Sequence, residues 1–181
     1  ADFFQDKRLI LGSQSPQRQR ILSTCTPLSF EAMKSSFVED LCKEDCASPA
    51  DYCIQTSLGK MRALNTSLDF DYDVLVTSDT IVVTNDGEIL EKPGDCDADT
   101  GLTDASTGQS NTTRTRTAAQ EAHRMLSKIA GDYVTALSSV VISYRIPGQA
   151  PQLAACCIKA KVHFAAFTDE DISAYIATGE P

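Results

Sequence analysis

The sequence contains no tryptophan and only two histidines, and its basic residues are outnumbered by its acidic residues. It has 16 Lys and Arg against 25 Asp and Glu, which gives a formal net charge of −9. Affinity for polymeric nucleic acid comes mainly from clustered Lys and Arg, so this class of partner is disfavoured. A small phosphorylated ligand remains compatible with the charge, because it needs only a few basic residues in one place.

Long apolar runs are also absent from the sequence. No stretch approaches the ~18 apolar residues of a membrane helix, and the apolar run at residues 9–11 is followed at once by Gly12 and Ser13. No signal peptide and no membrane partner are therefore expected. The seven cysteines are odd in number and include the adjacent pair Cys156 and Cys157, a pattern that favours reduced thiols and a cytoplasmic protein.

The cysteines and histidines argue against a zinc site and against a catalytic triad. No paired C-x-x-C is present, so Cys42, Cys46 and Cys53 are interpreted as small, semi-buried thiols rather than as zinc ligands. His123 falls in an expected helix and His163 in an expected strand, with no Ser or Cys partner identifiable from spacing. A triad hydrolase is therefore disfavoured.

The residues that are present indicate one α/β domain over residues 1–181. Their hydrophobic fraction of 42% and charged fraction of 23% are ordinary for globular proteins, and the length suffices for one core. Residues 94–117 are rich in Asp, Thr, Ser, Gly and Asn, so they predict a flexible surface insertion.

Hydrophobic periodicity and capping residues predict nine elements in the order β, α, α, β, β, α, β, β, α. The first is a strand over residues 8–12, followed by a helix that Ser15 caps. Ser48 begins the next helix, and apolar residues follow it at helical spacing. The apolar runs 74–76 and 81–83 flank a polar segment at 77–80, and a hairpin turn at 85–87 leads into residues 88–90, so two antiparallel strands are expected here. The remaining elements are a helix over 118–130, β-rich runs over 133–144 and 153–167, and a helix from 168 to Gly179. This order predicts a mixed sheet flanked by helices.

The loop at residues 12–16 (GSQSP) is a plausible anion site. Small residues allow close approach, and free backbone amides point outward at the positive end of a helix. Arg18 would add a bidentate phosphate contact. The alternative is an ordinary capped helix, because Ser-Pro caps are common.

Asp79 lies in an otherwise apolar strand, where an unpaired carboxylate is costly. A metal, a cation or a catalytic duty would explain it, and so would a structural aspartate that accepts bonds from backbone amides. Lys92 follows the hairpin and Lys60 lies in the second helix, where an exposed lysine is the simpler interpretation. The acidic cluster that includes Glu39 would help to bind a divalent cation or would be a solvated loop.

Taken in order, these segments resemble the Maf family. The resemblance begins at residues 9–18 (LILGSQSPQR), which are similar to the family's Ser-x-Ser-Pro-Arg-Arg loop. It continues through Phe30, Glu39, residues 59–63 (GKMRA), 78–82 (SDTIV), 87–93 (GEILEKP), 125–131 and 168–181.

The resemblance implies a fold like that of Maf proteins and inosine triphosphatases. It also implies an enzyme that hydrolyses nucleoside triphosphates to the monophosphate and pyrophosphate, a house-cleaning role in the nucleotide pool, and a homodimer. Ser-Asp-Thr with Glu-Lys-Pro is similar to the branch acting on dTTP and UTP, so Thr80 is implied in base specificity.

The same resemblance implies roles for individual residues. Ser13, Ser15 and Arg18 would hold the triphosphate, and Lys60 and Lys92 would neutralise its charge. Asp79 would orient or deprotonate the attacking water, and Glu39 would assist. A Mg²⁺ or Mn²⁺ ion bridging phosphate oxygens is implied, with Asp79 and Glu39 as its ligands.

This sequence departs from the family's pattern at four points. Gln17 stands where the family has its first arginine, Ser36 where an acidic residue is common, and Ser138 where a threonine is usual. The sequence also stops at Pro181, whereas Maf proteins continue through a segment with an active-site glutamine. The C-terminal part of the domain is therefore expected to be missing.

Two other functions remain open at this stage. One is a non-catalytic nucleotide-binding protein linked to septum formation and cell division. The other is an enzyme that acts on inosine or xanthosine triphosphate on a similar fold.

Overall fold

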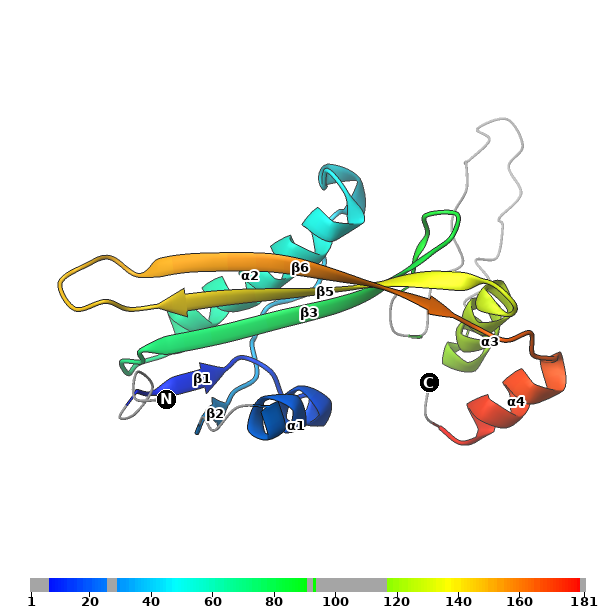
Figure 1. Ribbon diagram of the computed structural model, residues 1–181, viewed down its shortest axis with the longest axis horizontal. Helices are drawn as coiled ribbons and strands as arrows, with labels where there is room; N and C mark the ends of the chain where they lie inside the picture. The colour runs from blue at the N-terminus through cyan, green and yellow to red at the C-terminus, as the bar shows by residue number, and fades with distance from the viewer. Residues whose placement is uncertain (1–6, 26–28, 91–92, 94–116, 180–181) are drawn as a thin grey trace, which may run out of the picture. The chain divides into compact units, whose positions relative to one another are not determined.

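The computed structural model describes residues 7–25, 29–90, 93 and 117–179 (Figure 1). It divides into two compact units. The first comprises Ala1–Ile81 with Ala136–Ala160, and the second comprises Val82–Thr135 with Lys161–Pro181.

A mixed sheet with the order β2-β1-β3-β5-β6 organises the chain, and β4 pairs with β3 off this path. β1 is parallel to both β2 and β3, whereas β3 and β4 are antiparallel. The strands are β1 (Leu9–Leu11), β2 (Glu31–Ala32), β3 (Val74–Thr84), β4 (Ile89–Leu90), β5 (Tyr133–Tyr144) and β6 (Gln152–His163). This confirms the α/β class with a mixed sheet.

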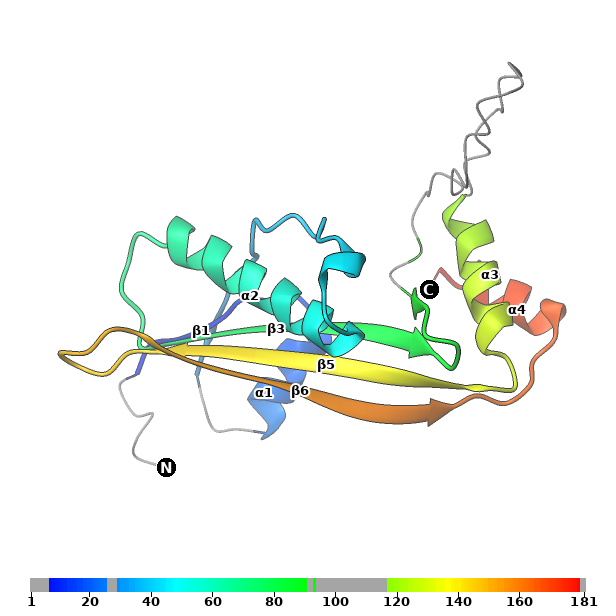
Figure 2. The same ribbon diagram turned by 90° about the horizontal axis from the view of Figure 1, so that it is seen from above.

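Helices α1 (Pro16–Cys25) and α2 (Pro49–Ser67) belong to the first unit. Figure 2 shows α2 running along one face of the sheet, with α1 on the other side. α2 begins as its sequence predicts, because the Ser48 side chain accepts a hydrogen bond from the Asp51 N–H and Pro49 occupies the first turn. The core between α2 and the sheet is formed by Ile10, Met61, Leu64, Tyr72, Leu75 and Val141.

The second unit contains β4, α3 (Ala118–Ile129) and α4 (Asp169–Ala177). Thr117 and Thr168 each form a capping box at the start of their helix. Its core consists of Leu90, Ile129 and Val134, with partly buried apolar side chains packed against them. None of the helices in the described part of the chain is both long enough and apolar enough to cross a membrane.

The expected antiparallel hairpin is confirmed, because β3 runs from Val74 to Thr84 with Asp79 inside it and pairs antiparallel with β4. The polar side chains are tolerated because they have partners. Thr77 is bonded to the Ser57 carbonyl and Asp79 to Lys60. The expected insertion at 94–117 lies outside the described residues, except for Thr117.

Candidate active site

The candidate site lies at the carboxyl ends of the parallel strands β1 and β2, beside the middle of β3. β1 pairs with β3 only as far as the Leu11↔Val76 pair. The loop containing Ser13 follows β1, the segment containing Glu39 follows β2, and Asp79 lies three residues past Val76 on β3. Ligands of α/β proteins usually bind at this edge of a sheet, because parallel strands bring the following loops together there.

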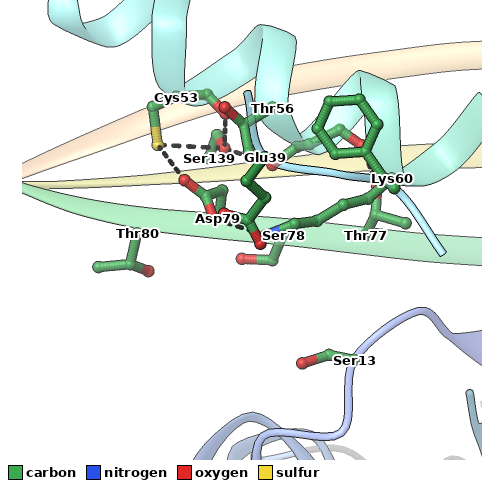
Figure 3. A network of polar contacts seen from close by, with 12 residues as sticks. Ser13, Glu39, Cys53, Thr56, Lys60, Thr77, Ser78, Asp79, Thr80 and Ser139 are labelled. Carbon is green, nitrogen blue, oxygen red and sulfur yellow. Dashed lines mark hydrogen bonds and ion pairs between the residues drawn. The ribbon is translucent and has the colours of Figure 1, made fainter. Parts of the chain in front are cut away.

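Lys60 on α2 contacts two carboxylates at once (Figure 3). Its Nζ lies 2.8 Å from Asp79 Oδ1 and 2.9 Å from Glu39 Oε1. The side chains of Lys60 and Asp79 are only 12% and 9% exposed, whereas that of Glu39 is 55% exposed. The buried charge of Asp79 is therefore compensated by the buried ammonium of Lys60, and the exposed carboxylate of Glu39 is a second partner of that ammonium.

The segment that carries Glu39 is attached to the part of α2 that carries Lys60. The Ser35 hydroxyl donates to the Lys60 carbonyl at 3.1 Å, and the Phe37 N–H donates to Ser35 Oγ. The Phe37 ring packs so closely on Gly59 that a Cβ there would lie 2.4 Å from it. Gly59 thus permits the approach that brings Glu39 to Lys60.

A buried polar network lies behind Asp79, between α2 and β5. The Cys53 thiol is 4.0 Å from Asp79 Oδ2 and 3.3 Å from Ser139 Oγ. Ser139 Oγ lies 2.6 Å from Ser57 Oγ, and its hydroxyl donates to the Cys53 carbonyl at 2.7 Å. Burial, followed by the neighbouring Cys53, raises the pKa of the Cys157 thiol on β6.

Sequence reasoning missed this network. Cys53 was interpreted as a small, semi-buried thiol, whereas the structure buries it completely, and Ser57 and Ser139 were not singled out. Small polar residues on the buried face of a helix and a strand were the available signal, because such positions usually hold aliphatic side chains.

Arg18 on α1 joins the predicted phosphate loop to β3. Its Nη1 donates to the Ser78 carbonyl at 3.0 Å and to Ser13 Oγ at 3.5 Å, and its Nη2 donates to Thr80 Oγ1 at 3.3 Å. Thr80 Oγ1 lies 3.1 Å from Ser138 Oγ. The guanidinium is therefore held in one orientation beside the loop.

Ser13 and Ser15 shape the loop itself. Ser13 Oγ accepts from the Ser15 N–H at 3.2 Å, and Ser15 Oγ accepts from the Arg18 N–H at 3.5 Å. Because Ser13 Oγ already accepts two hydrogen bonds, its own hydrogen is suited to donation to an anion.

The predicted site residues form two groups on opposite faces of β3, since successive strand residues alternate. Glu39, Lys60 and Asp79 lie on the face covered by α2, and Figure 3 shows Ser13 and Thr80 on the other side of the strand. Both groups adjoin the part of β3 beyond Val76, where pairing with β1 has ended. Lys92 lies outside the described residues.

Two carboxylates of the candidate site could serve as ligands of a divalent metal ion. Within the described ranges, no group of three or more His, Cys, Asp or Glu side chains is placed to hold a metal ion. Asp79 and Glu39 offer two carboxylates that converge on one ammonium. Mg²⁺ is commonly held by one or two carboxylates together with substrate phosphates, so this donor set fits such an ion once a triphosphate supplies further oxygens.

His123 has neighbours that its sequence context did not reveal. Ser127 Oγ lies 3.2 Å from its Nδ1, and Asp169 Oδ1 lies 3.6 Å from its Nε2. The Ser127 hydroxyl donates to the His123 carbonyl at 2.8 Å, and the Asp169 side chain is 86% exposed. The arrangement is that of a helix surface, and it lacks the buried acid of a catalytic triad.

The sequence of this chain is similar to those of several known proteins over nearly its whole length. A human protein described as a probable bifunctional dTTP/UTP pyrophosphatase/methyltransferase is 32% identical over 97% of this chain, which spans 25% of that protein. The dTTP/UTP pyrophosphatase of Syntrophotalea carbinolica is 30% identical over 97% of this chain, which spans 66% of that protein. That of Gloeobacter violaceus is 29% identical over 96% of this chain and 74% of that protein.

Among solved structures, the Staphylococcus aureus Ham1 protein aligns over 86% of this chain and 72% of its own, with a TM-score of 0.37 and 15% identity. The family model described as Maf-like protein matches residues 8–119 and 112–181, which is nearly the whole sequence. The chain belongs to the Maf-like protein family.

Proposed function

We propose that this chain is a nucleoside triphosphate pyrophosphatase that cleaves dTTP and UTP to the monophosphate and pyrophosphate. The observation that carries the proposal is the desolvated Lys60–Asp79 pair, with Glu39 on the same ammonium. Strongly desolvated charge at a ligand-binding edge of a sheet is typical of catalytic groups. The relatives named dTTP/UTP pyrophosphatase support the reaction and the substrates.

In the proposed reaction, water attacks one of the two phosphorus atoms joined by the α–β anhydride oxygen. A new P–O bond forms between the water oxygen and that phosphorus, the bond from the same phosphorus to the bridging oxygen breaks, and the monophosphate and pyrophosphate separate. Asp79 accepts the proton that the water loses. Lys60 fixes the Asp79 carboxylate through Oδ1, and the exposed carboxylate of Glu39, held by the same ammonium, would assist.

The phosphate groups are held by the loop after β1. Ser13 donates its hydroxyl hydrogen, and Arg18, whose guanidinium is already oriented by Ser78 and Thr80, supplies charge and further donors. Ser15 sets the loop conformation through its bond to the Arg18 N–H. Because these donors are oriented before substrate arrives, they stabilise the charge that develops on the phosphate oxygens.

Asp79 and Glu39 would hold a Mg²⁺ or Mn²⁺ ion together with phosphate oxygens of the substrate. When bound, it would neutralise phosphate charge and polarise the phosphoryl group. Lys92 is assigned to charge neutralisation and Thr80 to base selection, both on the family resemblance.

The test is a substrate panel. The chain would be incubated with dTTP, UTP, CTP, 7-methyl-GTP and ITP in Mg²⁺ or Mn²⁺, and pyrophosphate and monophosphate would be measured. The expected result is equimolar pyrophosphate and monophosphate from dTTP and UTP. Preference for ITP would favour an inosine triphosphatase, and nucleotide binding without turnover would favour a non-catalytic nucleotide-binding protein.

A further inference from the structure

The thiol of Cys53 is buried beside the proposed catalytic carboxylate. Its Sγ lies 4.0 Å from Asp79 Oδ2, while Lys60 contacts Asp79 Oδ1 (Figure 3). We propose that Cys53 is a positioning residue that donates its thiol hydrogen to Asp79 Oδ2, so that both carboxylate oxygens are held from α2. The consequence for turnover rests on the proposed function.

The Cys157 thiol on β6 is also a hydrogen-bonding neighbour of Cys53, and three oxygen acceptors lie within reach of the Cys53 hydrogen. They are Asp79 Oδ2, Ser139 Oγ at 3.3 Å and the Leu137 carbonyl at 3.5 Å. Only Asp79 carries a charge, and hydrogen bonds to ionised acceptors are roughly twice as strong as neutral ones. Because Sγ and Oδ2 are 4.0 Å apart, the hydrogen bond between Cys53 and Asp79 is weak, and its loss should lower kcat only modestly.

Ser139 Oγ already accepts a hydrogen bond from another residue of the network. Ser139 has one hydroxyl hydrogen, which it donates to the Cys53 carbonyl at 2.7 Å. Ser57 must therefore be the donor in the 2.6 Å contact between Ser57 Oγ and Ser139 Oγ. Ser139 thus needs no further donor, and the thiol is available to the carboxylate.

The fold explains why one helix supplies both partners of Asp79. Cys53 and Lys60 are seven residues apart on α2, so they lie on the same face two turns from each other. The Ser139 bond to the Cys53 carbonyl fastens this part of α2 to β5. The orientation of the Asp79 carboxylate is therefore set by the docking of α2.

The contact can be tested without turnover, by infrared spectroscopy of the S–H stretching band. Difference spectra between the wild-type chain and Cys53→Ala isolate the Cys53 band, and the measurement is repeated in an Asp79→Asn background. We expect the band to move to higher frequency in Asp79→Asn, because the thiol loses a charged acceptor. An unchanged band would mean that the thiol donates to Leu137, Ser139 or Cys157, and it would overturn the proposal.

The effect on catalysis is tested with three substitutions that separate donor from volume. Cys53→Ala removes both, Cys53→Val fills the space with a slightly larger apolar side chain and no donor, and Cys53→Ser keeps a donor. The kcat for dTTP should fall about fivefold in the Ala and Val variants, with KM changed by less than about twofold, and should recover in the Ser variant. Cys42→Ala, at an exposed thiol, is the control.

Recovery in Cys53→Val but not in Cys53→Ser would assign Cys53 to packing and would contradict the proposal. Absence of turnover in the wild-type chain would instead overturn the proposed function. The infrared result would then still decide whether the thiol donates to Asp79.

Discussion

Lys60 Nζ lies 2.8 Å from Asp79 Oδ1, and less than an eighth of either side chain is exposed. The pair joins the middle of α2 to the middle of β3. Burial of one charge without the other would be strongly unfavourable, so the stability of the first unit and its proposed chemistry depend on the same contact.

Lys60→Met should therefore impair both properties. It leaves the Asp79 carboxylate buried without its cation, and breaking such pairs costs roughly 3 kcal/mol of unfolding free energy. Urea denaturation at neutral pH measures this loss. The matched control is Arg62→Met, which removes an exposed cation from the same helix and should leave the unfolding free energy nearly unchanged. Equal stability of the two variants would contradict the buried pair.

Gly59→Ala should displace the segment that carries Glu39. The added Cβ would lie 2.4 Å from the Phe37 ring, and overpacking of this kind costs about 1–3 kcal/mol. We expect a lower unfolding free energy and a lower kcat for dTTP. The double variant Gly59→Ala with Phe37→Leu should recover part of both. A Gly59→Ala chain with wild-type stability and kcat would disprove this packing.

Arg18→Lys should weaken substrate binding even though the charge is kept. Two nitrogens of Arg18 reach different acceptors on β3, and a lysine ammonium cannot reproduce that fork. The KM for dTTP should rise about tenfold, which corresponds to about 1.4 kcal/mol of binding. Arg20→Lys, on the exposed side of α1, is the control and should leave KM unchanged.

The second unit should show a distinct acid dependence. The hydrogen bond from Thr84, followed by that from Lys128, lowers the pKa of Asp86 from 3.8 to about 2. Lys128 also lowers the pKa of Glu88. For groups with a lowered pKa, the stabilisation is present above the unfolded pKa and disappears as the pH falls through the folded pKa.

Lys128→Met should thus lower the melting temperature at neutral pH. The difference from the wild-type chain should shrink as the pH falls from about 4 to about 2, where Asp86 becomes protonated. Thermal unfolding across this range, followed at low salt, measures the difference. A gap between the two chains that stays constant down to pH 2 would exclude the proposed linkage.

Much of the local structure was predictable because its causes are local. The cap at Ser48 and the apolar spacing that follows fixed the start of α2, and Thr168 likewise capped α4. By contrast, β2 has only two residues and no periodicity, and it was not predicted. It exists because its backbone pairs with β1, a contact between residues distant in sequence.

In the candidate site, too, some features were predictable from the local sequence and others depend on tertiary contacts. Asp79 was identifiable because a carboxylate in an apolar strand needs a partner, yet nothing in the local sequence showed that the partner is Lys60. The tight packing of Phe37 on Gly59 and the position of Cys53 behind Asp79 depend on the docking of α2 against the sheet. Such relations arise only when the tertiary structure forms.

The most direct test of the account compares dTTP hydrolysis by the wild-type chain and by Asp79→Asn in Mg²⁺. Asp69→Asn, which alters an exposed carboxylate of the same unit, serves as the control. We predict pyrophosphate release that falls by at least about 100-fold in Asp79→Asn and is unchanged in Asp69→Asn. Equal rates in all three chains would contradict the assignment of Asp79 as the catalytic base.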